Sequence, residues 1–164
     1  MSHTAYIGVG TNLGDRIANF RTAVERVGEI EDTRVTRQSS LYESEPIGKA
    51  RNWFLNGVLE ITTELDAKAM LKQLQKIEAG MGRKKSKAKA SVSRIIDLDI
   101  LLFDGQVIAS RTLKVPHPEL PNRRFVLLPL SELAPALKHP VSAETISTLS
   151  VTTPDKTRVM LFKT

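Results

Sequence analysis

Apolar and polar residues follow four strand-like and two helix-like patterns up to residue 103. The strand-like patterns are short apolar or alternating runs bounded by turn residues, at 5–10, 33–42, 54–63 and 95–103. After the first and third runs, apolar residues recur at helical spacing, at Ile17, Phe20, Val24 and Val27 and then at Met70, Leu71, Leu74 and Ile77. Asp15 and Asp66 precede the helical stretches, and Asp is a favoured helix N-cap.

This order of strands and helices predicts the βαββαβ core of a ferredoxin-like α+β fold. We expect an antiparallel sheet whose helices cover one face and leave the other free. No repeat or linker interrupts the chain, so residues 1–164 should form one domain.

Less regular C-terminal additions follow the core. Asp104 and Gly105 predict a hairpin turn into Val107 and Ile108. Further on we expect a stiff extended segment, a helix and a final strand, at 115–118, 123–133 and 158–162 respectively.

Two acidic residues interrupt the most apolar of the predicted strands. Side chains alternate along a strand, so Asp97 and Asp99 share one face, about 7 Å apart, while the other face holds Ile96, Leu98, Ile100 and Leu102. Asp is depleted in strands, and like charges side by side are unfavourable, which argues against an incidental solvent-facing edge. The pair favours a site for divalent cations of the kind that hold nucleotide phosphates.

The excess of positive charge lies directly before this strand. The chain has 24 Lys and Arg against 18 Asp and Glu, and residues 83–94 contain six cations and no acid, so this segment carries the whole net charge of +6. A solvated loop would have the same composition, but cations beside two carboxylates also suit a polyphosphate with its metal. The chain has no cysteine and no apolar stretch of membrane-spanning length, so we expect a cytoplasmic protein without disulfides.

Three other features have both a functional and a structural interpretation. Gly8 and Gly10 open a strand-turn-helix, but the spacing does not fit a dinucleotide-binding loop, so we interpret them as backbone packing. Gln75 and Glu78 lie one helical turn apart and either face a ligand together or are solvated. His117 lies between two prolines and near Arg123, which suits phosphate, although a lone histidine is more often structural.

Taken together, these residues resemble the 6-hydroxymethyl-7,8-dihydropterin pyrophosphokinase family of folate biosynthesis. The most specific match is R-I-I-D-L-D-I-L-L-F over 94–103, and the similarity extends over nearly the whole chain, with further matches at 6–14, 115–118 and 122–125.

The resemblance implies that ATP donates its terminal diphosphate to the hydroxymethyl group of the pterin and that AMP is released. It implies two Mg²⁺ ions held by Asp97 and Asp99, and catalytic roles for Arg94, Asp97, Asp99, His117 and Arg123. The matching ATP-binding positions are Gln75, Glu78, Lys85, Lys89, Arg94, Ile100, His117 and Arg123. The matching pterin-binding positions are Ser44, Pro46, Ile47, Phe54, Asn56 and Phe125.

The chain departs from the family pattern in two loops. The family's R-W-G-P-R stretch is here Ala90–Arg94, without the Trp, Gly and Pro, and the loop after Ile47 is short. A catalytically weakened paralogue that binds pterin or nucleotide is therefore one alternative. An RNA-binding module is another, although only 5% of the residues are aromatic. We expect a monomer that binds small-molecule substrates and neither nucleic acid nor membrane.

Overall fold

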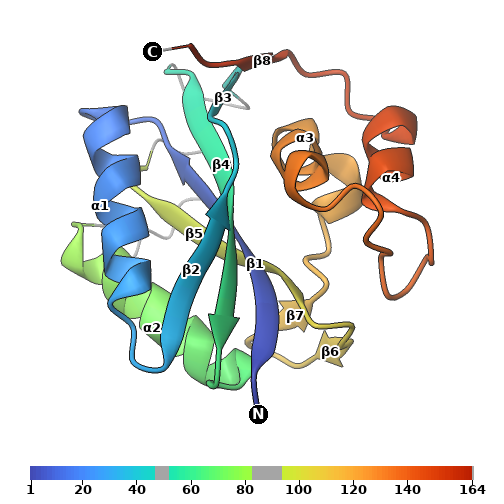
Figure 1. Ribbon diagram of the computed structural model, residues 1–164. Helices are drawn as coiled ribbons and strands as arrows, with labels where there is room; N and C mark the ends of the chain where they lie inside the picture. Colours follow the sequence, from blue (N-terminus) through green and yellow to red (C-terminus); the bar gives the residue numbers. More distant parts are fainter. Residues whose placement is uncertain (47–51, 83–93, 164) are drawn as a thin grey trace.

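The computed structural model describes residues 1–46, 52–82 and 94–163. Its main feature is a six-stranded antiparallel sheet in the order β5-β1-β4-β3-β8, with β2 also paired to β4 (Figure 1). The strands are β1 (His3–Thr11), β2 (Thr33–Gln38), β3 (Tyr42–Ser44), β4 (Phe54–Thr63), β5 (Asp97–Phe103) and β8 (Val159–Leu161). The first strands and helices have the predicted ferredoxin-like arrangement.

Two amphipathic helices, α1 (Arg16–Gly28) and α2 (Ala67–Gly80), cover one face of this sheet (Figure 1). Both begin as predicted: Asp15 accepts a hydrogen bond from Ala18 N–H at 3.1 Å and Asp66 accepts one from Ala69 N–H at 2.8 Å. Their apolar residues pack with the helix-facing residues of β1, β4 and β5 in one buried cluster.

The opposite face is partly covered, which contradicts the expectation that it is free. Helix α3 (Arg124–Leu133) packs on it through an apolar stripe, and α4 (Ile146–Thr152) lies against α3 (Figure 1). The 3₁₀ turn η1 (Leu120–Asn122) leads into α3. A cavity lies beside the first turn of α3.

A β-bulge in β5 interrupts the predicted alternation of its side chains between the two faces of the sheet. Ile7 pairs with Ile100 but Tyr6 pairs with Leu102, so Leu101 is an extra residue in the strand. Beyond this point Leu101 and Leu102 both pack beneath α3, whereas the strict alternation put Leu102 on the face of Ile100. Up to the bulge the alternation is confirmed, and Asp97 and Asp99 share the face that α3 partly covers.

Two further elements differ from the prediction. Residues 33–42 form β2 and the first residue of β3. The strand is interrupted from Ser39, whose hydroxyl accepts a hydrogen bond from Val58 N–H at 2.9 Å. After Asp104, β6 (Ile108–Ala109) pairs with β7 (Lys114–Val115) and not with β5, so the predicted hairpin is wrong about its partner. The final strand and the helix after Arg123 are confirmed, each within a residue or two of the predicted bounds.

Within the described ranges, no helix is both long enough and apolar enough to cross a membrane.

Candidate active site

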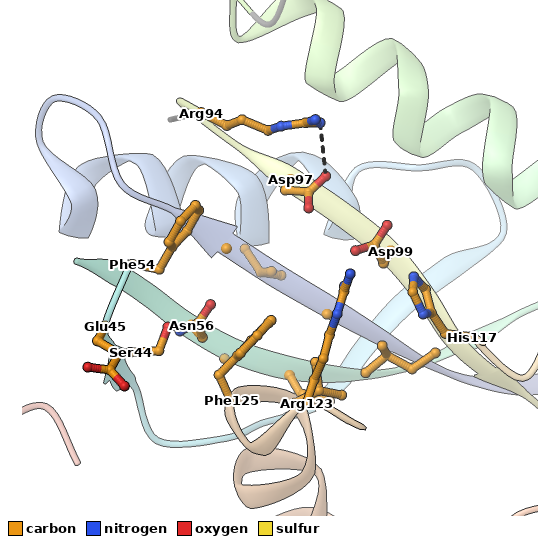
Figure 2. Close-up of a pocket in the computed structure, with 17 residues that line it drawn as sticks. Ser44, Glu45, Phe54, Asn56, Arg94, Asp97, Asp99, His117, Arg123 and Phe125 are labelled. Carbon is orange, nitrogen blue, oxygen red and sulfur yellow. Dashed lines mark hydrogen bonds and ion pairs between the residues drawn. The ribbon is translucent and has the colours of Figure 1, made fainter. Parts of the chain in front are cut away.

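A cavity of about 520 Å³ lies between the sheet and the first turn of α3. Strands β1, β4 and β5 form its floor, and the end of β3 and Arg123, which follows η1, form parts of its walls. Figure 2 shows that charged side chains from β5, the His117 loop and Arg123 gather at one end, and two aromatic rings and an amide at the other.

Glycines keep the floor of the cavity open. Gly10 pairs with Asn56 on one side and Asp97 on the other, and Gly8 pairs in the same way with Val58 and Asp99. A Cβ at position 10 would lie 3.2 Å from the Asn56 Oδ1 atom, closer than most Cβ contacts. This close approach agrees with the interpretation of the glycines as backbone packing, and both glycines also line the cavity.

One end of the cavity, called the amide-aromatic end below, combines two buried polar groups with two phenyl rings. Asn56 Nδ2 donates to Ser44 Oγ at 2.8 Å, and both residues are almost fully buried. Phe54 comes from β4 and Phe125 from α3, so the rings belong to opposite walls (Figure 2). A fixed amide between apolar rings suits a flat ligand rich in hydrogen-bonding groups.

Hydrogen bonds with Glu78 and Asn12 hold the backbone of the charged end in place. Glu78 of α2 is buried, and its Oε2 accepts from Leu98 N–H at 2.8 Å, which fixes β5 between the two aspartates. Arg94 is fixed at its backbone, where its N–H donates to Asn12 Oδ1 at 2.6 Å and its carbonyl accepts from Asn12 N–H at 3.0 Å. The Arg94 guanidinium lies 3.9 Å from the Asp97 carboxylate.

His117 is held with one ring nitrogen directed to its own loop. Nδ1 accepts from Glu119 N–H at 3.1 Å, so the proton of the neutral ring is on Nε2. Burial and the nearby Arg123 lower the pKa of His117, and Asp97 and Glu119 offset this in part. The ring is therefore neutral near pH 7, with one N–H free of its loop to donate to a ligand.

Arg123 precedes α3 and brings a second guanidinium to the cavity. Its side chain lies over the ring of Phe125, with 5.7 Å between the guanidinium carbon and the ring centroid. The charged and aromatic ends therefore meet at the first turn of α3.

The structure brings most of the predicted site residues together. Nine of them line the cavity: Ser44, Phe54, Asn56, Arg94, Asp97, Asp99, His117, Arg123 and Phe125. Four other predicted residues do not line it in the described part of the chain: Pro46, Gln75, Glu78 and Ile100. Ile47, Lys85 and Lys89 lie outside the described residues.

The interpretation in which Gln75 and Glu78 face a ligand together is not supported by their environments. Gln75 is exposed, whereas Glu78 is buried against β5, and Ile100 packs on the helix-covered face. Sequence reasoning also missed Glu45, Val58 and Leu101 as cavity residues. Only the Gly8-x-Gly10 alternation in a strand gave a signal for the floor.

The donor set at the charged end fits magnesium better than a metal that needs a closed protein cage. Among the described residues there is no cluster of three or more His, Cys, Asp or Glu side chains suited to a metal ion. Two carboxylates on one strand face are a set that Mg²⁺ accepts, since it completes its octahedron with water and substrate phosphates.

Comparison with known proteins identifies the family to which the chain is similar. A family model described as 7,8-dihydro-6-hydroxymethylpterin-pyrophosphokinase (HPPK) matches residues 6–135. The 2-amino-4-hydroxy-6-hydroxymethyldihydropteridine pyrophosphokinase of Bacillus subtilis is 40% identical over 147 residues, which are 88% of this chain and 87% of that protein.

Other similar proteins are longer. The Folic acid synthesis protein fol1 of Schizosaccharomyces pombe is 43% identical over 137 residues, 83% of this chain, but the match spans only 18% of that protein. The crystal structure of wild-type Plasmodium falciparum HPPK-DHPS with STZ-DHP has the same fold over 92% of this chain and 43% of that chain, with a TM-score of 0.72 at 18% identity.

Proposed function

Because the chain belongs to the 7,8-dihydro-6-hydroxymethylpterin-pyrophosphokinase family, we propose that it transfers the terminal diphosphate of ATP to 6-hydroxymethyl-7,8-dihydropterin, a step of folate biosynthesis. The hydroxymethyl oxygen forms a bond to the β-phosphorus and loses its proton to water, and the bond from that phosphorus to the oxygen bridging to the α-phosphate breaks. The products are AMP and the pterin diphosphate. The observation that carries this proposal is the division of one cavity into an amide-aromatic end and a charged end.

The amide-aromatic end is our proposed pterin site. Phe54 and Phe125 would stack on the two faces of the ring, and the Asn56 amide would pair with its nitrogen and carbonyl edge. The Ser44 hydroxyl, which accepts from Asn56 Nδ2, fixes the rotation of that amide. A ring held in this way has a single orientation, which aims its hydroxymethyl group along the floor toward the charged end.

The charged end is our proposed diphosphate-transfer site. Asp97 and Asp99 would hold two Mg²⁺ ions, which neutralise phosphate charge and polarise the phosphorus that is attacked. Arg94 and Arg123 bring guanidinium groups, whose forked N–H donors suit phosphate oxygens. His117 would donate a hydrogen bond from Nε2–H to an oxygen of the nucleotide, so that its ring stays neutral.

Glu78 supports this reaction indirectly, as a strand support and not as a ligand. Its carboxylate holds the amide between the two aspartates, so that both side chains point into the cavity. Roles for Pro46, Ile47, Gln75, Lys85, Lys89 and Ile100 in binding substrates stay predictions from the resemblance.

The charged and aromatic lining of the cavity supports small-molecule substrates, and the monomer stays a prediction from the sequence. The alternative of an RNA-binding platform has little support, since it needs an open sheet face with aromatic residues on the central strands. Here α3 covers part of that face, and β1 contributes glycines to it.

The proposal is tested by measuring nucleotide products from ATP and Mg²⁺, with and without the hydroxymethyl dihydropterin. We expect AMP in amounts equal to the pterin consumed, and no AMP without the pterin. Pterin and ATP binding without AMP formation would identify a weakened paralogue, and formation of ADP in place of AMP would refute the reaction.

A further inference from the structure

The segment between α4 and β8 lies against both walls of the cavity. This segment, residues 153–158, is called the C-terminal strap below; it lies beyond the 6–135 range that the family model matches. In Figure 1 it runs from α4 past α3 to β8, which pairs with β3. The strap thus connects the wall that carries Phe125 with the wall that carries Ser44.

On the α3 side, the strap supplies a helix cap that α3 lacks. Arg123 is the N-cap residue but makes no side-chain capping bond. Instead Asp155 Oδ2 accepts from Arg124 N–H at 2.7 Å, and Arg124 Nη1 donates to the carbonyl of Thr157 at 2.8 Å. A carboxylate at this position also interacts favourably with the positive end of the helix dipole.

A second contact holds the turn that leads into α3. Thr153 Oγ1 donates to the carbonyl of Pro121 at 2.7 Å, one residue inside the η1 turn. The strap therefore fixes the backbone on both sides of Arg123, at Pro121 and at Arg124. Phe125 follows Arg124 directly.

On the other side, the strap joins the end of β3. Arg158 N–H donates to Glu45 Oε1 at 2.8 Å, and Glu45 N–H donates to the Arg158 carbonyl at 3.1 Å. The Arg158 guanidinium lies 5.8 Å from the ring centroid of Trp53, the residue before Phe54. Glu45 lines the cavity and follows Ser44 directly.

The carboxylate of Asp155 is fixed by more than one bond. Its Oδ1 accepts from Thr157 N–H at 3.0 Å, so the side chain bridges the strap and α3. Burial acts to raise the pKa of Asp155, but the N–H donors of Arg124 and Thr157 outweigh it and hold the pKa below its usual value. The group is therefore ionised at neutral pH.

We propose that the C-terminal strap sets the separation of the two cavity walls, with Asp155 as a positioning residue for Arg123 and Phe125. The inference rests on the proposed function, because its consequence is the affinity for pterin and nucleotide. Without the Asp155 cap, the first turn of α3 frays in the free protein, and binding has to reorder it. Both ligands then bind more weakly, since Phe125 faces one and Arg123 the other.

The test compares Asp155→Ala with Asp155→Asn and with the matched control Lys156→Ala. Asp155→Asn keeps one acceptor oxygen, which can still cap Arg124 N–H, whereas Asp155→Ala removes both oxygens that accept from Arg124 and Thr157. Lys156 is an exposed residue of the same strap. The affinities of a non-reactive ATP analogue with Mg²⁺ and of the pterin are measured by calorimetry. Hydrogen exchange at the Val126 and Leu127 amides, which bond to the Arg123 carbonyl, reports on the first turn of α3.

We expect Asp155→Ala to speed exchange at these amides and to raise both dissociation constants about fivefold, the change that one helix cap produces. Lys156→Ala should stay within about twofold of the wild type, and Asp155→Asn, which keeps one of the two acceptor oxygens, should lie between the wild type and Asp155→Ala. A wild type that binds both ligands, with an Asp155→Ala variant equal to it, overturns the strap's role alone. An Asp155→Asn variant as poor as Asp155→Ala overturns the capping role. A wild type that binds neither ligand overturns the proposed function and the strap's role with it.

Discussion

Replacing Asn56 with alanine should weaken pterin binding far more than ATP binding. The Asn56 side chain is 4% exposed and donates to Ser44 Oγ at 2.8 Å, so the amide is preoriented at the aromatic end. Its loss leaves a polar edge of the bound pterin without a partner, at a cost of about 1–3 kcal/mol. This corresponds to a dissociation constant raised roughly 5- to 150-fold.

Calorimetric titration of the variant with the pterin, and separately with a non-reactive ATP analogue and Mg²⁺, measures the two losses. Ser39→Ala is the matched control, because it removes a buried hydrogen bond to Val58 N–H from a residue that does not line the cavity. This control should lower thermal stability and leave pterin affinity near the wild-type value. Equal losses for both ligands in Asn56→Ala would mean general destabilisation and would refute the reasoning.

Three further predictions concern the charged end. Asp99→Ala should abolish Mg²⁺-dependent transfer, while the melting temperature without ligand holds or rises slightly because repulsion from Asp97 is relieved; an active variant would contradict the metal role. The lowered pKa of His117 means that its contribution to stability is complete above the unfolded pKa of about 6.5 and is lost as the pH falls toward the folded pKa. The drop in melting temperature from pH 7.5 to pH 5.5 should therefore be larger in the wild type than in His117→Gln. Arg94→Ala should weaken binding of an ATP analogue more than Lys85→Ala, and this binding should weaken steeply with added salt; a flat salt profile would count against phosphate contacts.

The core of the fold was predictable because local signals agreed with the tertiary structure. Asp15 and Asp66 cap their helices, and the apolar spacing that follows each of them faces the sheet. The two aspartates of β5 were also predictable, since alternation depends only on the local strand geometry. These features need no information from distant residues.

The errors arise where distant segments decide the outcome. The bulge at Leu101 places Leu102 on the opposite face from the predicted one, and no residue type in the strand predicts the bulge. Helical spacing put Gln75 and Glu78 on neighbouring positions, but only the approach of β5 buries Glu78. Likewise, Gly10 becomes a cavity floor only because Asn56 and Asp97 flank it in the sheet.

The prediction that these residues surround one cavity depended on the family resemblance. Phe54 and Phe125 come from strands and helices far apart in the chain, and no spacing rule relates them. The role of the C-terminal strap could not be predicted either, because Asp155 is an unremarkable polar residue until its partner, Arg124 N–H, is known.

A crystal structure with the hydroxymethyl pterin, Mg²⁺ and a non-reactive ATP analogue tests the central claim most directly, that one cavity holds both substrates for in-line transfer. We predict the pterin ring between Phe54 and Phe125 with its edge on Asn56, and two metal ions joining Asp97 and Asp99 to the phosphates. The hydroxymethyl oxygen should face the β-phosphorus. A pterin bound away from Asn56, or phosphates bound away from the two aspartates, would contradict the account.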